Sequence, residues 1–591
     1  MKSKIDAATG YRLRYSSFDR SSNENVISFL LNEKFEVELG QEGYSLLVST
    51  ERIEVRANAT QGLFYGLMTL LQLLPPEIEG EAGRLNNLNI QCLQIKDFPR
   101  FQWRGIMLDV SRHFQPKEFI KSYIVQLAKY KYNIFHWHLT DDHGWRIEIE
   151  GLSKLTEIGA WKPSRIGRPG RFEPPQPHEM NTEGGFYTQS DIKEIVAFAK
   201  EHFITIVPEI DLPGHSLALI TAYPDMSCTK TKYPPQVGTP GFNGSLEVCV
   251  GNVYTWQILD SIFTQVCELF PSEYVHIGGD EVRYDFWLNC SHDRRLMETE
   301  GLSSGADLQA YFTSKLEKLV LSKGKKIIGW DDILHGQLDS SSIAMSWRGL
   351  GLEKNAAVRG HNAIMCPENF TYLNYAQGDT IVEPYFPRTI RLSTSYEFDP
   401  IAPSLPDSLH RYILGGQGNL WTENVFHYRH VEYMTWPRAI ALSEVFWSPL
   451  PKRNWVNFCD KIEDHFLRFD YANINYSRAL YDPIISGVID STIVVEKYES
   501  DTSFYPEFHG QFLDPRIKVV LSSEVPGLDI YYTFDNSNPD NFYSKYDGKP
   551  ITIPKGALGD SEIRVVTYRN GKPIGRQINC KLAEAAKRLQ L

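Results

Sequence analysis

The chain has 591 residues, of which 42% are hydrophobic and 23% are charged, as in an ordinary globular protein. This composition excludes a disordered, collagenous or fibrous protein, and no apolar run approaches the roughly 20 residues of a membrane-spanning helix. The formal net charge is −12, from 61 basic and 73 acidic residues, which disfavours a nucleic-acid-binding protein.

Residues 1–97 are predicted to form a small α/β domain. Residues 43–50 and 52–58 alternate hydrophobic and polar side chains, which indicates two strands joined by a turn. Residues 60–76 have helical spacing and end in two prolines. The segment contains no constellation of catalytic residue types, so we expect it to have a structural role.

Residues 98–482 are predicted to form a (β/α)8 TIM barrel, which makes the protein an α/β protein. Short apolar strands alternate with helical segments such as residues 116–130, 190–202 and 307–324, the pattern of a parallel sheet. The predicted strands are residues 103–112, 133–139, 204–211, 274–281, 325–332, 343–348, 363–369 and 412–423. No glycine-rich phosphate loop follows the first of them, which argues against a dinucleotide-binding fold.

Residues 483–591 are predicted to form a small C-terminal β-sandwich. The expected strands are residues 491–500, 516–523, 528–540, 549–555 and 562–575. This domain could bind sugar, or it could be an appendage that only packs against the rest, and the packing role is the simpler interpretation.

The predicted barrel strands end in polar and aromatic residues. These are Asp109, His136, His138, Asp141, Asp142, Glu209, Asp211, Asp280, Glu281, Asp331, Asp332, Trp421 and Glu423. The carboxyl ends of the strands and the loops after them build the active site of a TIM barrel. Since buried unpaired charges are costly, we expect an active site there rather than a set of folding contacts.

The sequence HIGGDEV contains the most informative pair, Asp280 and Glu281. Neighbours on a regular strand point to opposite faces, so both acids can enter one pocket only where the glycines break the strand. Close carboxylates repel each other, so one tends to keep its proton while the other ionises. A proton donor beside a fixed anion suits glycoside cleavage. A pair of acids binding magnesium is the alternative.

His136 and His138 support a rival hypothesis, because an H-x-H at a strand end is typical of metal-dependent barrel hydrolases. That chemistry needs further histidines, and the segments around Trp330 and Trp347 supply none. We therefore expect these histidines to support hydrogen bonding in the pocket, and we expect no metal or other cofactor. Trp330, Trp347 and Trp421 should converge at the barrel mouth, where they would enclose an apolar group or a pyranose face.

The eight cysteines include no C-x-x-C pair, which excludes a zinc ribbon. Cys228 and Cys249 flank a loop rich in proline and glycine and could pair as a disulfide, or both could be free. The segment MKSKIDAATGYRLRY lacks the apolar core of a signal peptide. It favours either a cytosolic protein or one whose signal peptide lies outside this sequence.

The barrel motifs resemble those of glycoside hydrolase family 20, the β-N-acetylhexosaminidases. The matching stretches, in chain order, are WRGIMLDVSRHF, NIFHWHLTDDHGWRIEI, PEIDLPGHS, HIGGDE, GWDDI, MSWRG and NLWTE. The N-terminal segment is similar to the α/β domain that precedes the barrel in this family, and the C-terminal segment to the β-sandwich of bacterial members. The resemblance implies exo-acting, retaining hydrolysis of terminal β-linked GlcNAc or GalNAc. We expect a periplasmic or extracellular location.

The resemblance also implies catalytic roles, because in this family the 2-acetamido oxygen of the substrate attacks the anomeric carbon. Glu281 would be the general acid and then the base. Asp280 would orient the acetamido N–H, and Tyr372 would hold its oxygen. His215, with Asp141 behind it, would form a hydrogen-bonded relay to Glu281.

Further roles concern substrate binding. Trp330, Trp347 and Trp421 would enclose the acetamido methyl group, while Arg104 and Glu423 would hold ring hydroxyls. The expected partner is therefore a glycan with a terminal β-N-acetylhexosamine, and no nucleic acid or membrane. A non-catalytic carbohydrate-binding protein on the same barrel remains the main alternative, and a metal-dependent hydrolase is the other.

Asn374 departs from the family pattern, because the usual Y-x-D reads Tyr372-Leu373-Asn374 here. The acid normally contacts the outer hydroxyls of the sugar. Asn374 can still hydrogen-bond but has no charge. We expect either that it binds the free 6-hydroxyl or that it lets the site accept 6-O-sulfated GlcNAc.

Overall fold

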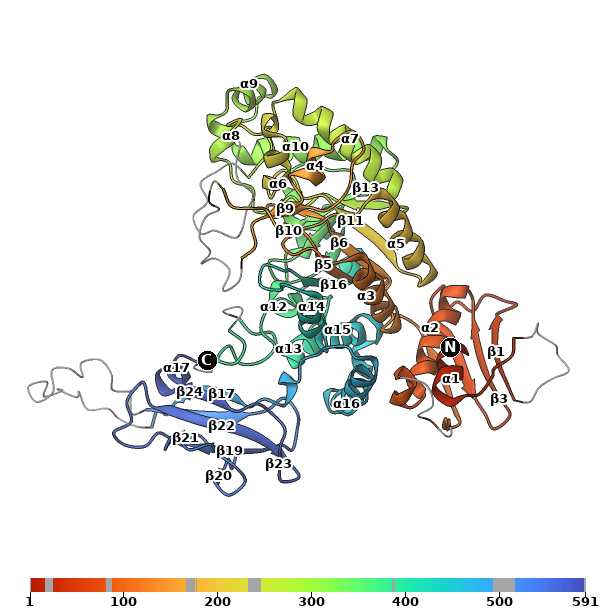
Figure 1. Cartoon of the computed structure of the whole chain (residues 1–591), viewed down its shortest axis with the longest axis vertical. Coiled ribbons are helices and arrows are strands. Elements are labelled where there is room, and N and C mark those ends of the chain that lie inside the picture. The colour runs from red at the N-terminus through yellow and green to blue at the C-terminus, as the bar shows by residue number, and fades with distance from the viewer. Residues whose placement is uncertain are drawn as a thin grey trace, which may run out of the picture. The chain divides into compact units, whose positions relative to one another are not determined.

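Figure 1 shows the computed structural model, which describes residues 2–15, 25–80, 85, 88–165, 176, 178–231, 246–384, 388–492 and 516–588. The chain forms two compact units. One contains Met1–Asn374, Ser395–Arg453 and Glu463–Asn475, and the other contains Tyr375–Thr394, Asn454–Ile462 and Tyr476–Leu591. The three-domain division, with boundaries at 97/98 and 482/483, stays a prediction from the sequence.

A four-stranded sheet opens the first unit, in the order β1-β3-β2-β4. Its strands are β1 (Val26–Leu31), β2 (Tyr44–Val48), β3 (Arg52–Ala57) and β4 (Leu93–Asp97). The predicted hairpin is confirmed, since β2 and β3 pair antiparallel. The predicted helix is α2 (Thr60–Leu73), which packs so closely on β3 that a Cβ on Gly66 would lie 2.4 Å from Val55 Cγ1. Helix α1 (Lys2–Thr9) precedes the sheet.

The barrel is closed and all its strand pairs are parallel. Its strands are β5 (Trp103–Asp109), β6 (Ile134–His138), β11 (Thr205–Glu209), β12 (Tyr274–His276), β13 (Lys326–Trp330), β14 (Ile343–Ser346), β15 (Asn362–Met365) and β16 (Ile413–Leu420). The predicted (β/α)8 fold is therefore confirmed. Closure joins β16 to β5, and it brings the carboxyl ends of the strands together at one end of the barrel.

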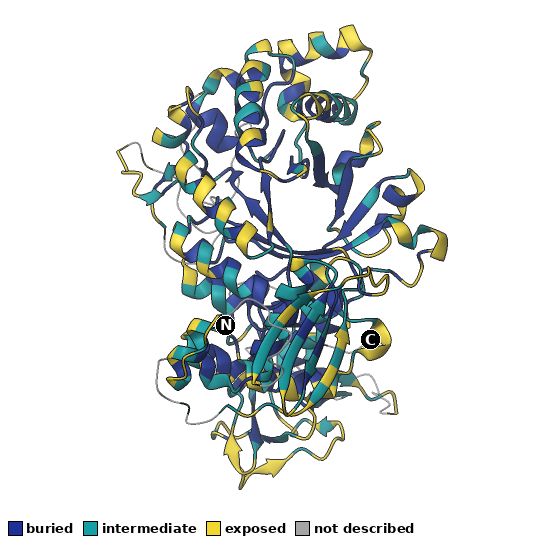
Figure 2. Ribbon diagram, turned by 90° about the vertical axis from the view of Figure 1, so that its right-hand side faces the viewer, coloured by how far each residue is buried: buried dark blue, intermediate teal, exposed yellow. Residues whose placement is uncertain are grey.

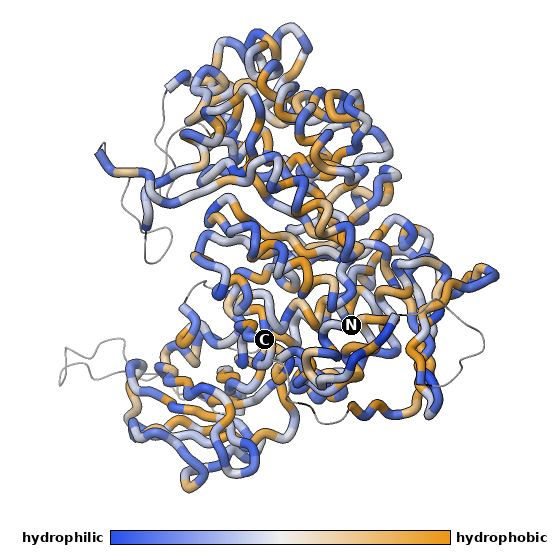
Figure 3. Tube along the Cα trace, turned by 45° about the vertical axis from the view of Figure 1, so that its right-hand side comes forward, coloured by the Kyte–Doolittle hydropathy of each residue, from blue (hydrophilic) through white to orange (hydrophobic). Residues whose placement is uncertain are grey.

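Helices surround the barrel strands, which are coloured as buried in Figure 2. The main ones are α3 (Lys117–Lys129), α5 (Gln189–Glu201), α7 (Val253–Leu269), α10 (Gly305–Ser322), α11 (Glu353–Val358), α14 (Tyr428–Thr435) and α15 (Arg438–Trp447). Helix α16 (Trp455–Ala472) follows them in the chain. In α3 the buried residues Phe119, Ile120, Tyr123, Ile124 and Leu127 follow the spacing of one helix face. Figure 3 shows the resulting alternation of hydrophobic and hydrophilic residues along the helices.

Shorter elements lie in the loops between the barrel strands. The strands are β7 (Thr140–Asp141), β8 (Gly144–Trp145), β9 (Trp161–Lys162) and β10 (Glu183–Gly184). The helices are α4 (Lys154–Glu157), α6 (Leu217–Ala222), α8 (Asp285–Asn289), α9 (Ser291–Glu300), α12 (Glu368–Thr371) and α13 (Leu392–Glu397). Within the described ranges, no helix is long and apolar enough to cross a membrane.

The second unit contains two antiparallel sheets. One has the order β17-β18-β21, and the other has β20-β19-β22-β23 with β24 also paired to β22. The elements are β17 (Ile484–Ile489), β18 (Ile517–Ser522), β19 (Asp529–Thr533), β20 (Ser544–Lys545), β21 (Ile551–Thr552), β22 (Glu562–Arg569), β23 (Lys572–Pro573), β24 (Ile578–Lys581) and α17 (Leu582–Lys587).

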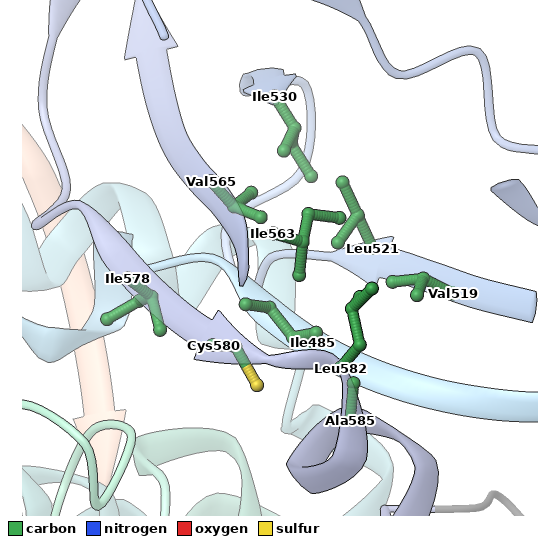
Figure 4. Packing of buried hydrophobic residues seen from close by; sticks show 10 residues of the cluster. All are labelled: Ile485, Val519, Leu521, Ile530, Ile563, Val565, Ile578, Cys580, Leu582 and Ala585. Carbon is green, nitrogen blue, oxygen red and sulfur yellow. The ribbon is translucent and has the colours of Figure 1, made fainter. Parts of the chain in front are cut away.

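Residues from both sheets and from α17 form one buried cluster, shown in Figure 4. This cluster includes Val519 from β18, Val565 from β22 and Leu582 from α17, so the two sheets share a core as expected of a β-sandwich. The sequence did not predict β17, β20 or β24. Most of the strand predicted at residues 491–500 lies outside the described residues, which resume at 516.

Candidate active site

The acid pair follows a sharp break after β12. The strand ends at His276, and the left-handed residues Gly278 (φ 69°) and Gly279 (φ 105°) then turn the chain. A Cβ on Gly278 would lie 1.6 Å from Asp211 Oδ1, so only glycine fits. Glu281 is itself left-handed, with φ 50°. The break expected from the sequence is therefore present.

The two acids differ in environment. The side chain of Asp280 is 12% exposed, whereas that of Glu281 is 62% exposed. Burial raises the pKa of Asp280 to about 7, and Glu209 and Glu281 add to this effect against the opposing effect of His215. A hydrogen bond from His215 lowers the pKa of Glu281. Burial therefore favours the protonated form of Asp280, whereas His215 favours the ionised form of Glu281.

His215 lies between two pairs of acids. Its Nδ1 is 3.3 Å from Asp141 Oδ1 and 3.3 Å from Asp142 Oδ2. Its Nε2 is 3.5 Å from Glu281 Oε2 and 3.7 Å from Asp280 Oδ2. Burial alone would lower the pKa of His215, but the acids, Asp141 foremost, raise it well above the usual value. The ring is therefore a cation that faces both carboxyl groups.

Two further side chains, besides His215, hold Asp141. Arg112 Nη2 lies 2.7 Å from Asp141 Oδ2, and His138 Nε2 lies 2.9 Å from the same oxygen. Burial disfavours the charged carboxylate, but Arg112 and His215 hold the pKa of Asp141 well below its usual range. Asp141 is thus a fixed anion behind His215.

The three predicted tryptophans lie in one series of ring contacts with Tyr372. The ring centroids of Trp330 and Trp421 are 5.8 Å apart, and those of Tyr372 and Trp421 are 6.3 Å apart. Trp347 stacks on Tyr372 at 6.4 Å with an interplanar angle of 17°. Trp330 and Trp421 are buried and Trp347 is half-buried, so the structure brings all three indoles together as one aromatic wall.

Arg104 does not lie at this site, and the sequence prediction for it is wrong. It is the second residue of β5, near the opposite end of the barrel from the acid pair. Its guanidinium group pairs with Glu42 at 2.7 Å and donates to the backbone carbonyl of Phe101 at 2.8 Å. These contacts compensate the positive charge of the buried guanidinium group, so Arg104 has a structural role.

Arg112 occupies the position that Arg104 was expected to fill. It follows the carboxyl end of β5, pairs with Asp109 at 3.3 Å, and lies 5.0 Å from the ring centroid of Trp421. Both arginines belong to WRGIMLDVSRHF. The signal that could have distinguished them is their position along the strand, because Arg104 lies at its start and Arg112 follows its end. A residue after the carboxyl end of a barrel strand faces the site, and one at the start does not.

Glu423 and Asn374 each present a buried oxygen without a hydrogen-bond partner among the described residues, Oε2 of Glu423 and Oδ1 of Asn374. Burial raises the pKa of Glu423, and the nearby Arg112 opposes this effect. Buried polar atoms are normally paired, so unpaired ones beside an aromatic wall indicate groups that bind a ligand.

The histidines of the H-x-H pair surround Glu209. His136 Nε2 lies 2.9 Å from Glu209 Oε2, and His138 Nδ1 lies 2.5 Å from the same atom. His276, which the sequence analysis did not single out, lies 3.0 Å from Glu209 Oε1. The same oxygen accepts a 3.1 Å hydrogen bond from Trp330 Nε1. The buried cluster therefore positions a tryptophan of the aromatic wall.

The fold and the site together define a (β/α)8-barrel protein of the glycoside hydrolase type. The chain belongs to glycosyl hydrolase family 20: the model of the family's catalytic domain matches residues 101–450, and the model of its domain 2 matches residues 2–98. Residues 519–579 match the model described as Fn3 associated.

Relatives and solved structures agree with this assignment. The chain is 38% identical over 444 residues to a beta-hexosaminidase of Porphyromonas gingivalis, covering 74% of this chain and 55% of the relative. It is 31% identical over 450 residues to a beta-hexosaminidase of Akkermansia muciniphila, covering 76% and 87%. An exo beta-N-acetylglucosaminidase of Vibrio harveyi, solved with N-acetylglucosamine, has a TM-score of 0.67 at 32% identity and covers 77% and 69%.

The chain spans only part of some relatives. It covers 55% of the Porphyromonas gingivalis protein and 65% of a beta-hexosaminidase of Vibrio furnissii.

Proposed function

We propose that the protein is an exo-acting β-N-acetylhexosaminidase that releases terminal β-linked GlcNAc or GalNAc with retention of configuration. The acid pair is the observation that carries this proposal. Asp280 is buried and has a raised pKa, Glu281 is exposed and has a lowered pKa, and His215 faces both of them. Two carboxyl groups with different environments are what acid–base cleavage of a glycoside requires.

In the first step, the acetamido oxygen of the substrate attacks the anomeric carbon while Glu281 gives its proton to the departing glycosidic oxygen. The product of this step is a bicyclic oxazolinium ion. Asp280 accepts a hydrogen bond from the acetamido N–H and stabilises the positive charge. The Tyr372 hydroxyl donates a hydrogen bond to the acetamido oxygen. In the second step, the Glu281 carboxylate takes a proton from water, which attacks the anomeric carbon and opens the ring.

Substrate binding has to reverse this order of the two pKa values. A bound sugar removes water from around Glu281, which raises its pKa. An acetamido N–H that donates to Asp280 favours the Asp280 carboxylate and lowers its pKa. His215 Nε2 lies near both carboxyl groups, so it supplies a path for the proton between them.

The aromatic wall and the polar groups beside it account for selectivity. Trp330, Trp347 and Trp421 enclose the acetamido methyl group and exclude water from the reacting centre. Arg112 and Glu423 hold ring hydroxyls. These roles make the acetamido group both the recognition element and the nucleophile. We also propose a periplasmic or extracellular location, in keeping with a glycan substrate.

The test compares an aryl β-GlcNAc with the matching aryl β-glucoside, and follows the first-formed anomer of the sugar by NMR. We expect turnover of the GlcNAc substrate with β product formed first, and no turnover of the glucoside, which lacks the internal nucleophile. Comparable kcat/KM for the two substrates would indicate an enzyme nucleophile instead. Binding of GlcNAc without turnover would identify a carbohydrate-binding protein.

A further inference from the structure

Three cysteines and one aspartate meet in a cluster to which the proposed reaction assigns no role. Their ligand atoms, the sulfurs of Cys228, Cys249 and Cys290 and a carboxylate oxygen of Asp293, all lie within 4.8 Å of one another. Cys228 and Cys249 lie on either side of residues 232–245, Cys290 connects α8 to α9, and Asp293 belongs to the first turn of α9. Three separate segments of the chain therefore converge on one point.

The cysteines of this cluster are free thiols, so the suggested Cys228–Cys249 disulfide is absent from the structure. The sulfurs of Cys249 and Cys290 are 3.6 Å apart. A disulfide would hold two sulfurs at about 2.05 Å. Two thiolates on one tetrahedral zinc ion, each at about 2.3 Å from the metal, lie about 3.8 Å apart. The observed separation is close to that of the zinc site.

A distance between a cysteine sulfur and the Asp293 carboxylate also fits two ligands of one zinc ion. Cys249 Sγ lies 3.6 Å from Asp293 Oδ1, and Cys228 Sγ lies 3.0 Å from Asp293 Oδ2. A sulfur and an oxygen ligand of one tetrahedral zinc ion lie about 3.5 Å apart, given zinc distances of about 2.3 and 2.0 Å. The Cys249 distance matches this value, whereas Cys228 lies closer and approaches the other carboxylate oxygen.

Asp293 supplies a second, independent observation. Its side chain is fully buried, and among the described residues no lysine, arginine or histidine forms an ion pair with it. Its hydrogen-bond donors are the backbone N–H of Gly251, at 2.6 Å, and the thiols of Cys228 and Cys249. A buried carboxylate without a cation is costly, and a metal ion would supply the missing positive charge.

We propose that Cys228, Cys249, Cys290 and Asp293 bind one Zn²⁺ ion as a closed structural site. Four protein ligands leave no open coordination position, which distinguishes a structural from a catalytic zinc site. Binding would release the protons of the three thiols. The sequence analysis missed the site because its ligands do not follow a C-x-x-C pattern: Cys290 and Asp293 form C-x-x-D, and the other two ligands come from distant segments.

The site lies beside the loops that hold the catalytic groups. Glu247, two residues before Cys249, accepts a 2.9 Å hydrogen bond from the backbone N–H of Arg283, two residues after Glu281. The backbone of Val248 donates to the Pro213 carbonyl at 3.1 Å, close to His215. A zinc ion that fixes Cys249 would therefore also fix the loops around Glu281 and His215, without touching the substrate.

The test measures the zinc content of the full chain, purified without chelator, by inductively coupled plasma mass spectrometry. We expect about one zinc ion per chain. Protein freed of metal under reducing conditions and titrated with Co²⁺ should develop thiolate-to-cobalt charge-transfer absorption and the intense visible bands of tetrahedral cobalt. Both measurements use the wild-type protein and do not depend on glycosidase activity, so they can fail or succeed separately from the proposed function.

Variants locate the site. We expect Cys249→Ser and Asp293→Asn to lose the bound zinc and the tetrahedral cobalt spectrum. Cys267→Ser is the matched control, because Cys267 is also buried and lies in α7 outside the cluster. Cys267→Ser should retain the bound zinc and the tetrahedral cobalt spectrum. Removing zinc should lower the Tm of the wild type and of Cys267→Ser, but not that of the ligand variants.

Three results would overturn the proposal. The first is wild-type protein that binds neither zinc nor cobalt after equilibration with the metal under reducing conditions. The second is a disulfide that joins two of the three clustered cysteines in freshly purified protein, detected by peptide mapping without reduction. The third is zinc that remains bound in folded Cys249→Ser and Asp293→Asn, which would place the ion elsewhere.

Discussion

His215 Nε2 lies 3.5 Å from Glu281 Oε2, so a buried imidazolium directly faces the exposed member of the acid pair. This cation lowers the pKa of Glu281 and opposes the rise in the pKa of Asp280. Because both effects come from one ring, the protonation of the whole site depends on His215.

Replacement of His215 by asparagine should move the alkaline limb of the pH profile of kcat/KM to higher pH. The acid pair shares one proton that it loses near pH 7, the pKa of Asp280. Without the neighbouring cation, both carboxyl groups hold a proton more tightly, so this loss occurs at higher pH. The profile is measured on an aryl β-GlcNAc. The exposed His335→Asn is the control, and an unchanged limb in His215→Asn would refute the coupling.

Glu281→Gln should lower kcat by about 10² to 10⁴-fold on a substrate with a poor leaving group, such as chitobiose. An aryl substrate has an acidic leaving group that departs with little protonation. The rate of the first step on this substrate should therefore fall much less. The measurement is therefore kcat for both substrates in wild type and variant. A near-wild-type rate on chitobiose would exclude Glu281 as the general acid.

Asp280→Asn should stabilise the fold above neutral pH and have little effect at pH 4. The pKa of Asp280 is about 7 in the folded protein, above the ordinary value of 3.8, so the folded state binds this proton more tightly than the unfolded state. The free energy of unfolding therefore falls, on account of this group, as the pH rises from about 4 to about 7. Asparagine cannot ionise and does not cause this loss of stability. We therefore expect the free energy of unfolding of the variant to exceed that of the wild type by roughly 1 to 3 kcal/mol at pH 8.

The measurement is the Tm of wild type and Asp280→Asn at pH 4 and pH 8. The exposed Asp285→Asn serves as the control, because its charge is solvated in both states. A Tm difference that does not depend on pH would show that the Asp280 carboxyl does not titrate in this range.

Arg112→Lys and Arg104→Lys should have different effects. Arg112 contacts two acids and an indole of the site, so its loss should lower kcat/KM by about 10 to 100-fold, as expected for charge-assisted contacts that lysine cannot reproduce. Arg104 pairs with Glu42 away from the site, so its replacement should lower the Tm and leave KM unchanged. Steady-state kinetics and thermal unfolding of both variants test this. A selective rise in KM for Arg104→Lys would reverse the assignment.

Asn374→Asp should selectively impair hydrolysis of a 6-O-sulfated aryl β-GlcNAc. An aspartate would place a second negative charge near the sulfate, and like charges about 4 Å apart cost roughly 1 kcal/mol in water and several times more when partly desolvated. In the wild type, the Asn374 side chain is buried and carries no charge. The ratio of kcat/KM for sulfated and unsubstituted substrates should fall at least tenfold in the variant. Equal ratios in both proteins would mean that position 374 does not contact the 6-substituent.

The sequence by itself determined the barrel and its acid pair. Local periodicity identifies the eight barrel strands and the longer helices between them, and eight repeats of that pattern have one common solution in a closed parallel barrel. The glycines of HIGGDE encode the break that turns Asp280 and Glu281 into one site, because only glycine tolerates the left-handed backbone and close packing at Gly278. The tryptophans at the strand ends converge for the same topological reason.

Only the tertiary structure decided between Arg104 and Arg112, because both belong to one motif and differ in which end of β5 they occupy. It also set the order of the pKa values in the acid pair, since that order depends on burial and on His215, a residue far away in the sequence. The same applies to the cluster of Cys228, Cys249, Cys290 and Asp293. Local periodicity carries information about neighbours along the chain, whereas these groups meet only because closure of the barrel brings separate loops together.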